Sequence, residues 1–169
     1  MIFRDDDIHF ETDLRRFKHI DSLFIEYGIE HHIAVICHRM GLHTELIDYI
    51  HKHPHIIPQI HGWEHIDYTV NHNLIREHLT LCIKQMQYLG FAKPTIFFPP
   101  WNRTDDVINF VAGELGLIVL HEKNTLTDFI QGNPLVPGDI INFHYWADMD
   151  SQMLEPALRI ERENRKAKT

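Results

Sequence analysis

The sequence predicts an α/β fold in which parallel strands are joined by helical crossovers. Short apolar runs alternate with amphipathic runs along the chain, and this strand–helix order is typical of parallel sheets. The 169 residues are enough for one domain, and 44% hydrophobic with 24% charged residues is typical of a globular protein. A doubly wound sheet and a β/α barrel both agree with this order.

The first half of the chain begins with a strand and continues in alternation. Strands are expected at residues 1–4, 32–37 and 56–60. Helices are expected at residues 12–27, 44–53 and 71–89. Gly28, Pro54 and Gly90 stand where these helices would end. Pro58 favours an edge or irregular position for the third strand, because proline cannot donate a backbone hydrogen bond.

The second half repeats the pattern with shorter elements. Further strands are expected at residues 95–98, 117–120 and 139–143. Thr104 would cap a helix that runs to Leu115, and a closing helix is expected from Asp150 onward. Residues 131–138 contain two prolines and two glycines and are expected to form a surface loop.

Charge and composition exclude several classes of protein. The 24 acidic and 16 basic residues give a net charge of −8, which disfavours non-specific nucleic-acid binding. An apolar run of membrane-spanning length is absent from the sequence, so no membrane partner is expected. No secretory signal is recognisable, and a cytoplasmic location is expected by default. Cys37 and Cys82 are expected to be free buried thiols.

Polar residues follow nearly every expected strand. The segments after the successive strands are Asp5–Asp7, Cys37–Arg39, His61–His65, Pro99–Arg103, His121–Glu122 and His144–Trp146. Parallel α/β folds place their sites at the carboxyl ends of the strands. We therefore expect these segments to converge on one site.

His61 and His65 are spaced as a pair of metal ligands. A helical turn would place two such residues on one face, within reach of one ion. The chain has 15 histidines, so roughly one pair at this spacing is expected by chance. His51 and His55 are a second pair, which flanks Pro54 and cannot lie in a regular helix.

The aspartate run Asp5-Asp6-Asp7 strengthens the interpretation of the histidine pair. Three consecutive carboxylates repel one another unless a cation lies nearby, although a solvated turn or helix cap would also tolerate them. One aspartate with His61 and His65 would form a three-ligand site with open positions for water and substrate. A second aspartate beside the metal could act as general base.

Four segments together resemble motifs of the polysaccharide deacetylase family, the NodB-homology carbohydrate esterases. They are Arg4-Asp5-Asp6-Asp7-Ile8, His61-Gly62-Trp63-Glu64-His65, Phe98-Pro99-Pro100-Trp101-Asn102 and Ile140-Ile141-Asn142-Phe143-His144. The resemblance extends from residue 4 to residue 146. It implies a distorted or incomplete β/α barrel of parallel strands, with residues 1–169 forming one catalytic domain.

The resemblance also implies a role for each matching residue. Asp6 would be the catalytic base, Asp7 would bind the metal with His61 and His65, and His144 would be the general acid. The alternative register, with Asp5 as base and Asp6 as ligand, remains open. The predicted substrate-binding residues are Pro100, Trp101 and Asn102.

The sequence departs from the family pattern at two places. Phe98 stands where the family has an arginine that pairs with the base, and Arg103 or Arg4 are the candidates to replace it. A fourth motif is not recognisable near His121 and Glu122. Trp101 is as compatible with the core as with the groove, and Trp146 is expected to be structural.

The expected function is metal-dependent hydrolysis of an N-acetyl or related acyl group on an amino sugar or polysaccharide. The cofactor would be one divalent metal ion, with zinc first and cobalt, nickel or iron as alternatives. The partner would be a small-molecule or oligosaccharide substrate, and an open barrel edge would favour a homo-oligomer. Two alternatives remain: a hydrolase of cyclic amides or imides on the same scaffold, and a catalytically silent carbohydrate-binding protein.

Overall fold

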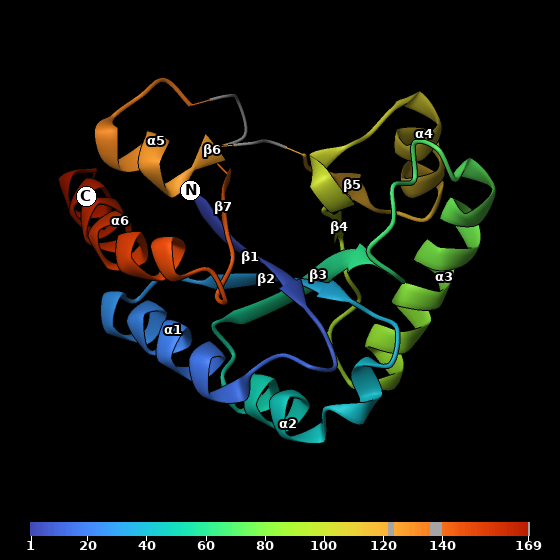
Figure 1. The fold of residues 1–169 in the computed structure, drawn as a ribbon, viewed down its shortest axis with the longest axis horizontal. Coiled ribbons are helices and arrows are strands. Elements are labelled where there is room, and N and C mark those ends of the chain that lie inside the picture. Colours follow the sequence, from blue (N-terminus) through green and yellow to red (C-terminus); the bar gives the residue numbers. More distant parts are fainter. Residues whose placement is uncertain (122–123, 136–139, 169) are drawn as a thin grey trace.

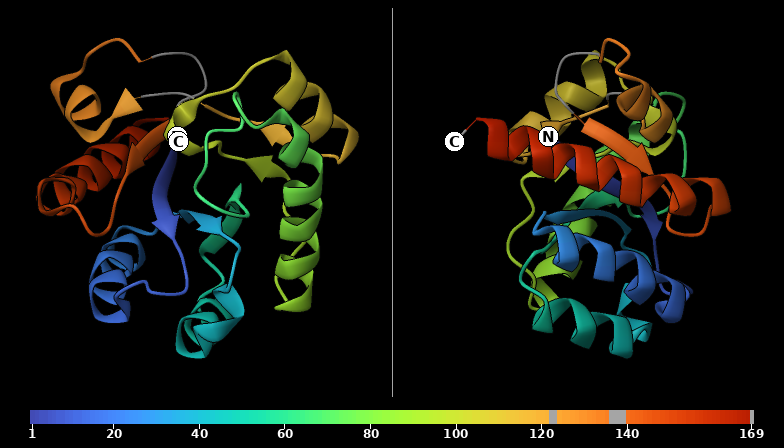
Figure 2. Two further views of the ribbon diagram at one scale, coloured as in Figure 1. Left: turned by 45° about the vertical axis from the view of Figure 1, so that its right-hand side comes forward. Right: turned by 90° about the vertical axis from the view of Figure 1, so that its left-hand side faces the viewer.

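The strands of the protein form one curled, parallel sheet. The computed structural model describes residues 1–121, 124–135 and 140–168. The described residues contain seven strands in the order β5-β4-β3-β2-β1-β7-β6, and all of their pairings are parallel. This is the cyclic order of a barrel that is open between β5 and β6, and the helices surround it (Figures 1 and 2). The predicted incomplete β/α barrel is confirmed, and the doubly wound alternative is wrong.

Strands and helices alternate for most of the chain. The strands are β1 Ile2–Ile8, β2 His31–Ile36, β3 Ile56–Gly62, β4 Ile96–Phe97, β5 Ile118–Val119, β6 Asn124–Thr125 and β7 Ile140–Phe143. The α-helices are α1 Leu14–Tyr27, α2 Thr44–Lys52, α3 His72–Tyr88, α4 Asp106–Glu114, α5 Leu126–Gln131 and α6 Asp148–Ala167. Two short 3₁₀ helices are η1 Met40–Leu42 and η2 Pro100–Asn102.

Two strands differ from the prediction in ways that affect the site. β1 continues to Ile8, so the aspartate run lies within the strand and does not follow it. β3 is an internal strand between β2 and β4, although Pro58 favoured an edge. β4 pairs with β3 only at Ile60, and the Gln59 side chain accepts hydrogen bonds from the backbone of residues 95 and 96. β4 therefore requires no backbone hydrogen bond from residue 58, and a proline is tolerated there although β3 is internal.

The helix ends follow the local capping chemistry. Gly28 ends α1 in the left-handed conformation at φ 65°, as predicted. The expected cap Thr104 is wrong, because Asp105 accepts the hydrogen bond from the Ile108 backbone N–H. β6 and α5 were not predicted, and α6 begins two residues before Asp150. Asp139 and residues 136–138 of the predicted strand and loop lie outside the described residues.

The sheet separates two regions of packed side chains. The larger core lies between the sheet and the helices, where Phe3 of β1 packs against Phe24 and Phe129. A small cluster fills the inside of the curl, formed by Ala34, Phe98 and Ile140. Successive residues of β1 alternate between these regions. Arg4 and Asp6 therefore point into the curl, and Phe3 and Asp5 point toward the helices.

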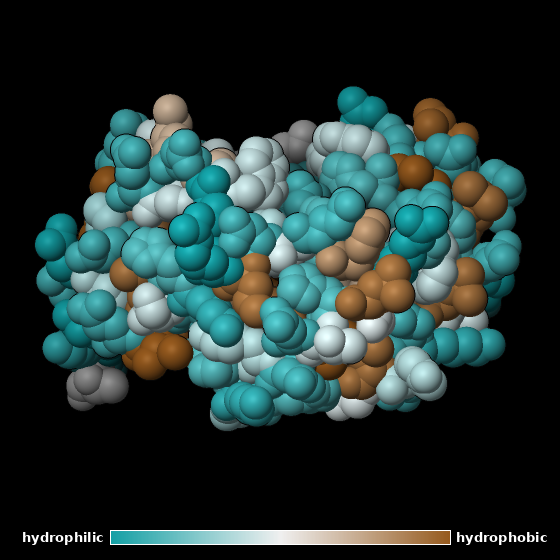
Figure 3. All heavy atoms as spheres, turned by 60° about the horizontal axis from the view of Figure 1, so that its bottom comes forward, coloured by the Kyte–Doolittle hydropathy of each residue, from teal (hydrophilic) through white to brown (hydrophobic). Residues whose placement is uncertain are grey.

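Most of the surface shown in Figure 3 is hydrophilic, with hydrophobic residues in small groups among the polar ones. Cys37 and Cys82 are buried free thiols, as expected. Among the histidines, His31 is fully buried. Within the described part of the chain, no helix is long and apolar enough to cross a membrane.

Candidate metal centre and active site

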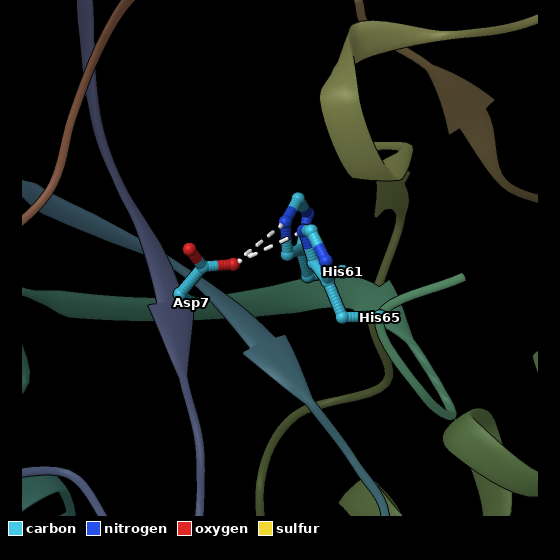
Figure 4. Close-up of side chains that lie close together, drawn as sticks. All are labelled: Asp7, His61 and His65. Atoms are coloured by element: carbon cyan, nitrogen blue, oxygen red, sulfur yellow. Dashed lines mark ion pairs between the residues drawn. The ribbon is translucent and has the colours of Figure 1, made fainter. Parts of the chain in front are cut away.

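Asp7, His61 and His65 converge at the carboxyl end of the sheet. Asp7 comes from the end of β1, His61 from the end of β3 and His65 from the bend that follows β3. The Asp7 Oδ1 atom lies 3.3 Å from Nε2 of each histidine (Figure 4). In the described residues this is the one group of at least three histidine, cysteine or acidic side chains with ligand atoms all within 4.8 Å of one another.

An irregularity in β1 directs Asp7 into the cleft. The pairing of β1 with β2 shifts register between Asp5 and Ile8, and Asp7 adopts the left-handed conformation at φ 62°. A residue other than glycine is rarely found there, and the strain is of the order of 1–3 kcal/mol. The bulge therefore rotates the Asp7 carboxylate toward His61 and His65.

The histidine pair is brought together by a tight turn, and the helical turn considered from the sequence is wrong. Gly62 has φ 120°, and a Cβ atom there would lie 2.8 Å from the Glu64 backbone oxygen. It would also lie 3.1 Å from the Tyr68 hydroxyl oxygen. Only glycine fits this turn without displacing its neighbours. The two imidazole centroids are 5.1 Å apart as a result.

The hydrogen bonding of His61 prepares its Nε2 atom to bind a cation. Nδ1 lies 2.7 Å from the Phe98 backbone oxygen, so the proton belongs on Nδ1 and Nε2 carries a lone pair. Oδ1 of Asp7 is buried and has no hydrogen-bond partner among the described residues. Two lone pairs thus face each other across 3.3 Å. Two ligands of one tetrahedral zinc ion lie about that far apart, so the donor set fits a divalent metal.

The electrostatics of the triad agree with this assignment. Burial raises the pKa of Asp7, but its contact with His61 and the charges of His61, His65 and His144 lower it more. Burial is the main reason why the pKa of His65 lies below its ordinary value. The carboxylate is therefore ionised and His65 neutral near pH 7, which are the forms that bind metal.

Asp6 lies beside the triad and is held by a buried arginine. Its Oδ2 atom accepts a hydrogen bond from Arg4 Nη2 at 2.7 Å, and the same nitrogen donates to Asn102 Oδ1 at 2.8 Å. The Arg4 guanidinium is fully buried and lies 4.8 Å above the centre of the Phe98 ring. Arg4 thus occupies the place of a charge partner for Asp6, while Arg103 pairs with Asp67 at 2.5 Å.

Asp5 points away from this cleft, into the core behind β1. It is fully buried, and burial raises its pKa from an ordinary 3.8 to about 6 despite its contact with His31. Asp6 and Asp7 line the cleft, whereas Asp5 does not. This placement favours the register with Asp6 as base and Asp7 as ligand.

His144 lies at the opposite wall, just after β7. Its Nε2 atom is 3.7 Å from Asp7 Oδ2, and its Nδ1 atom is 3.5 Å from Asp150 Oδ2. Asp150 also accepts the hydrogen bond of the His144 backbone N–H at 2.9 Å. Burial lowers the pKa of His144, but Asp150, Asp6 and Asp7 raise it above its ordinary value. The imidazolium is therefore favoured, as a proton donor requires.

The cleft has a volume of about 290 Å³ and combines polar and aromatic walls. Its lining residues are Asp6, Asp7, His61, His65, Trp101, Asn102, Asn142, His144 and Trp146. Trp101 packs edge-on against His65 at 4.3 Å and is half exposed. Of the three predicted substrate-binding residues, Trp101 and Asn102 lie in this wall, whereas Pro100 is buried behind it.

Several residues of the site were missed or misjudged from the sequence. Trp146, expected to be structural, lines the cleft with 48% of its surface exposed and contacts His144 at 4.8 Å between ring centroids. Asn142 was not considered, although its position two residues before His144 was a signal because alternate residues of a strand face one side. His121 is exposed and lies outside the cleft lining, and Glu122 lies outside the described residues.

Comparison with solved structures identifies the fold as that of family 4 carbohydrate esterases. A family 4 carbohydrate esterase from Streptomyces lividans in complex with acetate has a TM-score of 0.75 and 13% identity, over 98% of this chain and 88% of that one. A peptidoglycan N-acetylglucosamine deacetylase in complex with 4-naphthalen-1-yl-N-oxidanyl-benzamide has a TM-score of 0.76 and 17% identity, over 99% and 81%. A family 4 pseudoenzyme from Bacillus anthracis has a TM-score of 0.77 and 10% identity, over 97% of this chain and 60% of its own.

These similarities were found by comparison of structures. No family model and no curated protein sequence matches the chain. The predicted resemblance to polysaccharide deacetylases is confirmed at the level of the fold.

Proposed function

We propose that residues 1–169 form a single catalytic domain that removes an N-acetyl group from an amino sugar or oligosaccharide. The observation that carries this proposal is the convergence of Asp6, Asp7, His61, His65 and His144 on one cleft. They come from three strand ends, and each has the chemistry that amide hydrolysis needs. The fold shared with a peptidoglycan N-acetylglucosamine deacetylase supports the same reaction class. The acetate bound to the Streptomyces esterase is the acid that this reaction would release.

In this proposal Asp7, His61 and His65 hold one divalent metal ion, with zinc as the first candidate. Such an ion lowers the pKa of water and polarises an amide carbonyl. Asp6 Oδ1 is buried without a hydrogen-bond partner among the described residues, so it is free to accept a proton from the attacking water. Arg4 holds the other oxygen of Asp6 in place.

His144 completes the proposed reaction on the other side of the cleft. Attack of water on the carbonyl carbon forms a new C–O bond, and collapse of the tetrahedral adduct then breaks the C–N bond. The departing nitrogen needs a proton to leave as an amine. His144 donates that proton, and Asp150 orients its ring. Trp101 and Trp146 offer exposed apolar faces on the two walls, which suit the flat face of a sugar ring.

The catalytically silent alternative has one observation in its favour, since one structural neighbour is a family 4 pseudoenzyme. The sequence argument for it was the absence of a recognisable fourth motif near His121 and Glu122. Arg4, two residues before Asp6 on β1, supplies a guanidinium to that carboxylate, and this pairing supports an active site.

The test is acetate release from N-acetylglucosamine oligomers by the zinc-loaded chain. We expect turnover in the wild type, and a loss of about 10²–10⁴-fold in Asp6→Asn and in His144→Ala with zinc still bound. His19→Ala, a change at an exposed residue of α1, is the matched control and should keep full activity. No acetate from a fully zinc-loaded wild type would refute the deacetylase proposal. Tight oligomer binding in that inactive protein would favour the silent binding protein.

A further inference from the structure

A chain of buried polar side chains runs behind β1, on the side away from the cleft. Asp5, His31 and Asp21 are all fully buried. His31 Nδ1 lies 2.9 Å from Asp21 Oδ1, and His31 Nε2 lies 3.4 Å from Asp5 Oδ2. The reaction proposed above uses none of these three residues.

The His31 ring is held rigidly between aromatic neighbours. It stacks on Phe24 with the ring centroids 4.1 Å apart and the planes 3° from parallel, and on Phe17 at 5.4 Å. The ring therefore cannot turn, and its two nitrogens stay directed at Asp21 and Asp5. This anchors the Asp5 carboxylate from behind.

Asp21, at the far end of the chain of polar groups, is saturated with hydrogen bonds. Its Oδ1 atom also lies 2.8 Å from His55 Nε2, and its Oδ2 atom accepts the Tyr49 hydroxyl proton at 2.8 Å. Asp21 of α1 is thereby held by α2 and by the turn that precedes β3. The anchor for His31 is thus tied to the surrounding layer of helices.

Asp5, at the near end, holds the turn that carries His144. Its Oδ1 atom accepts the Tyr145 backbone N–H at 2.8 Å. The Tyr145 hydroxyl in turn accepts the Asp13 backbone N–H at 3.2 Å, so this buried residue is held at both ends. Backbone pairing between β1 and β7 ends at Asp5 and Phe143 and does not reach His144.

Stability alone is a weak reason for a core to keep these charges. Buried ion pairs lose so much hydration that apolar residues of similar volume are often equally stabilising. These charged side chains lie beside the turn that follows β7. The backbone pairing of β1 with β7 has ended there, so a side chain, Asp5, supplies the hydrogen bond to the Tyr145 backbone.

We propose that Asp5, anchored by His31 and Asp21, is a positioning residue that holds the Tyr145 backbone and thereby His144 over the metal ligands. The inference rests on the proposed function, in which His144 donates a proton to the leaving amine. It assigns the first aspartate of the run a task different from those of Asp6 and Asp7.

The test compares Asp5→Ala with Asp5→Asn, because asparagine keeps an oxygen that can accept the Tyr145 N–H. With zinc-loaded protein and N-acetylglucosamine oligomers, we expect kcat to fall about 10²-fold in Asp5→Ala, with KM and zinc affinity little changed. Asp5→Asn should restore kcat to within about threefold of the wild type. Asp5→Leu fills the site without an acceptor and replaces Asp5→Ala if alanine leaves the chain unfolded.

The control for a merely structural effect is Leu158→Ala, which removes a buried side chain from α6. It should lower the melting temperature but leave kcat per folded molecule unchanged. If kcat of Asp5→Ala matches that of Leu158→Ala, the positioning role is overturned. The same conclusion follows if Asp5→Asn is as slow as Asp5→Ala.

A second readout separates this inference from the proposed function. Hydrogen exchange of the Tyr145 amide reports the bond to Asp5 without any turnover. We expect exchange at Tyr145 to be at least about tenfold faster in Asp5→Ala and nearly unchanged in Asp5→Asn. A wild type that releases no acetate would refute the deacetylase alone. Unchanged Tyr145 exchange in Asp5→Ala would refute the positioning role whatever the activity.

Discussion

Replacing Arg4 by methionine should destabilise the protein far more than replacing an exposed arginine. Arg4 is fully buried, and its Nη2 atom lies 2.7 Å from a carboxylate oxygen of Asp6, which is itself 4% exposed. Methionine keeps most of the side-chain length and can pack on Phe98, so the main change is the loss of the positive charge.

The magnitude follows from the geometry of the pair. At 2.7 Å and an effective dielectric constant of about 20, the direct attraction is about 6 kcal/mol. Removing Arg4 also removes its own desolvation cost, so we expect a net loss of about 3–5 kcal/mol in the free energy of unfolding. Arg103→Met is the matched control: Arg103 pairs with Asp67 at a 62% exposed position, and the loss should stay below about 1 kcal/mol.

The assay is urea unfolding in the presence of EDTA, so that bound metal does not contribute to stability. The double variant Arg4→Met/Asp6→Asn removes both charges and should be less unstable than the sum of the single variants. We expect an interaction energy of about 2–3 kcal/mol from this cycle. Strict additivity would show that Arg4 is not the charge partner of Asp6.

Three further predictions concern the turn at Gly62, the proposed proton donor His144 and the buried Asp5. Gly62→Ala should lower stability and weaken zinc binding, because its Cβ would lie 2.8 Å from the Glu64 backbone oxygen. Gly113→Ala is the control and should change neither stability nor zinc binding, because a Cβ there has open space around it. Asp150→Asn should move the basic limb of the pH–rate profile to lower pH, since Asp150 helps to raise the pKa of His144. The folded-state pKa of Asp5 is raised to about 6, so the native state binds more protons than the unfolded chain between pH 4 and 6. Its contribution to stability is complete below about pH 4 and is lost as the pH rises through 6. The stability of the wild type relative to Asp5→Asn, measured by urea unfolding, should fall by roughly 2–3 kcal/mol from pH 4 to pH 7.

The strand–helix order predicted where the reactive residues meet. Carboxyl ends of parallel strands lie at one edge of a sheet, so the order of the elements alone brings Asp7, His61 and His144 together. The same order did not exclude a doubly wound sheet, because the periodicity of the elements does not say whether the sheet curls into a barrel.

Tertiary pairings could not be predicted in the same way. Arg4 reaches Asp6 because alternate residues of β1 enter the curl, where the Arg4 guanidinium lies over Phe98. Asp150 contacts His144 because α6 turns back directly after β7. The sequence did not distinguish the buried His31 from the other histidines among the 15. Its burial depends on packing against α1 and the aromatic core.

Local signals explain the missed elements. β6 has two residues, which is too short for any periodicity to be visible. α5 begins at a capping box formed by Thr125 and Asp128, and this four-residue pattern was readable in the sequence. Thr104 and Asp105 are both residue types that cap helices well, and only the backbone decides in favour of Asp105.

We propose that Asp7, His61 and His65 bind one divalent metal ion. Titration calorimetry with zinc on the metal-free chain tests it most directly, using His65→Ala and the exposed-site control His72→Ala. We predict one ion per wild-type chain, an unchanged affinity in His72→Ala, and a loss of more than about 100-fold in His65→Ala. Zinc binding of equal affinity in all three proteins, or no binding in the wild type, would refute this metal site.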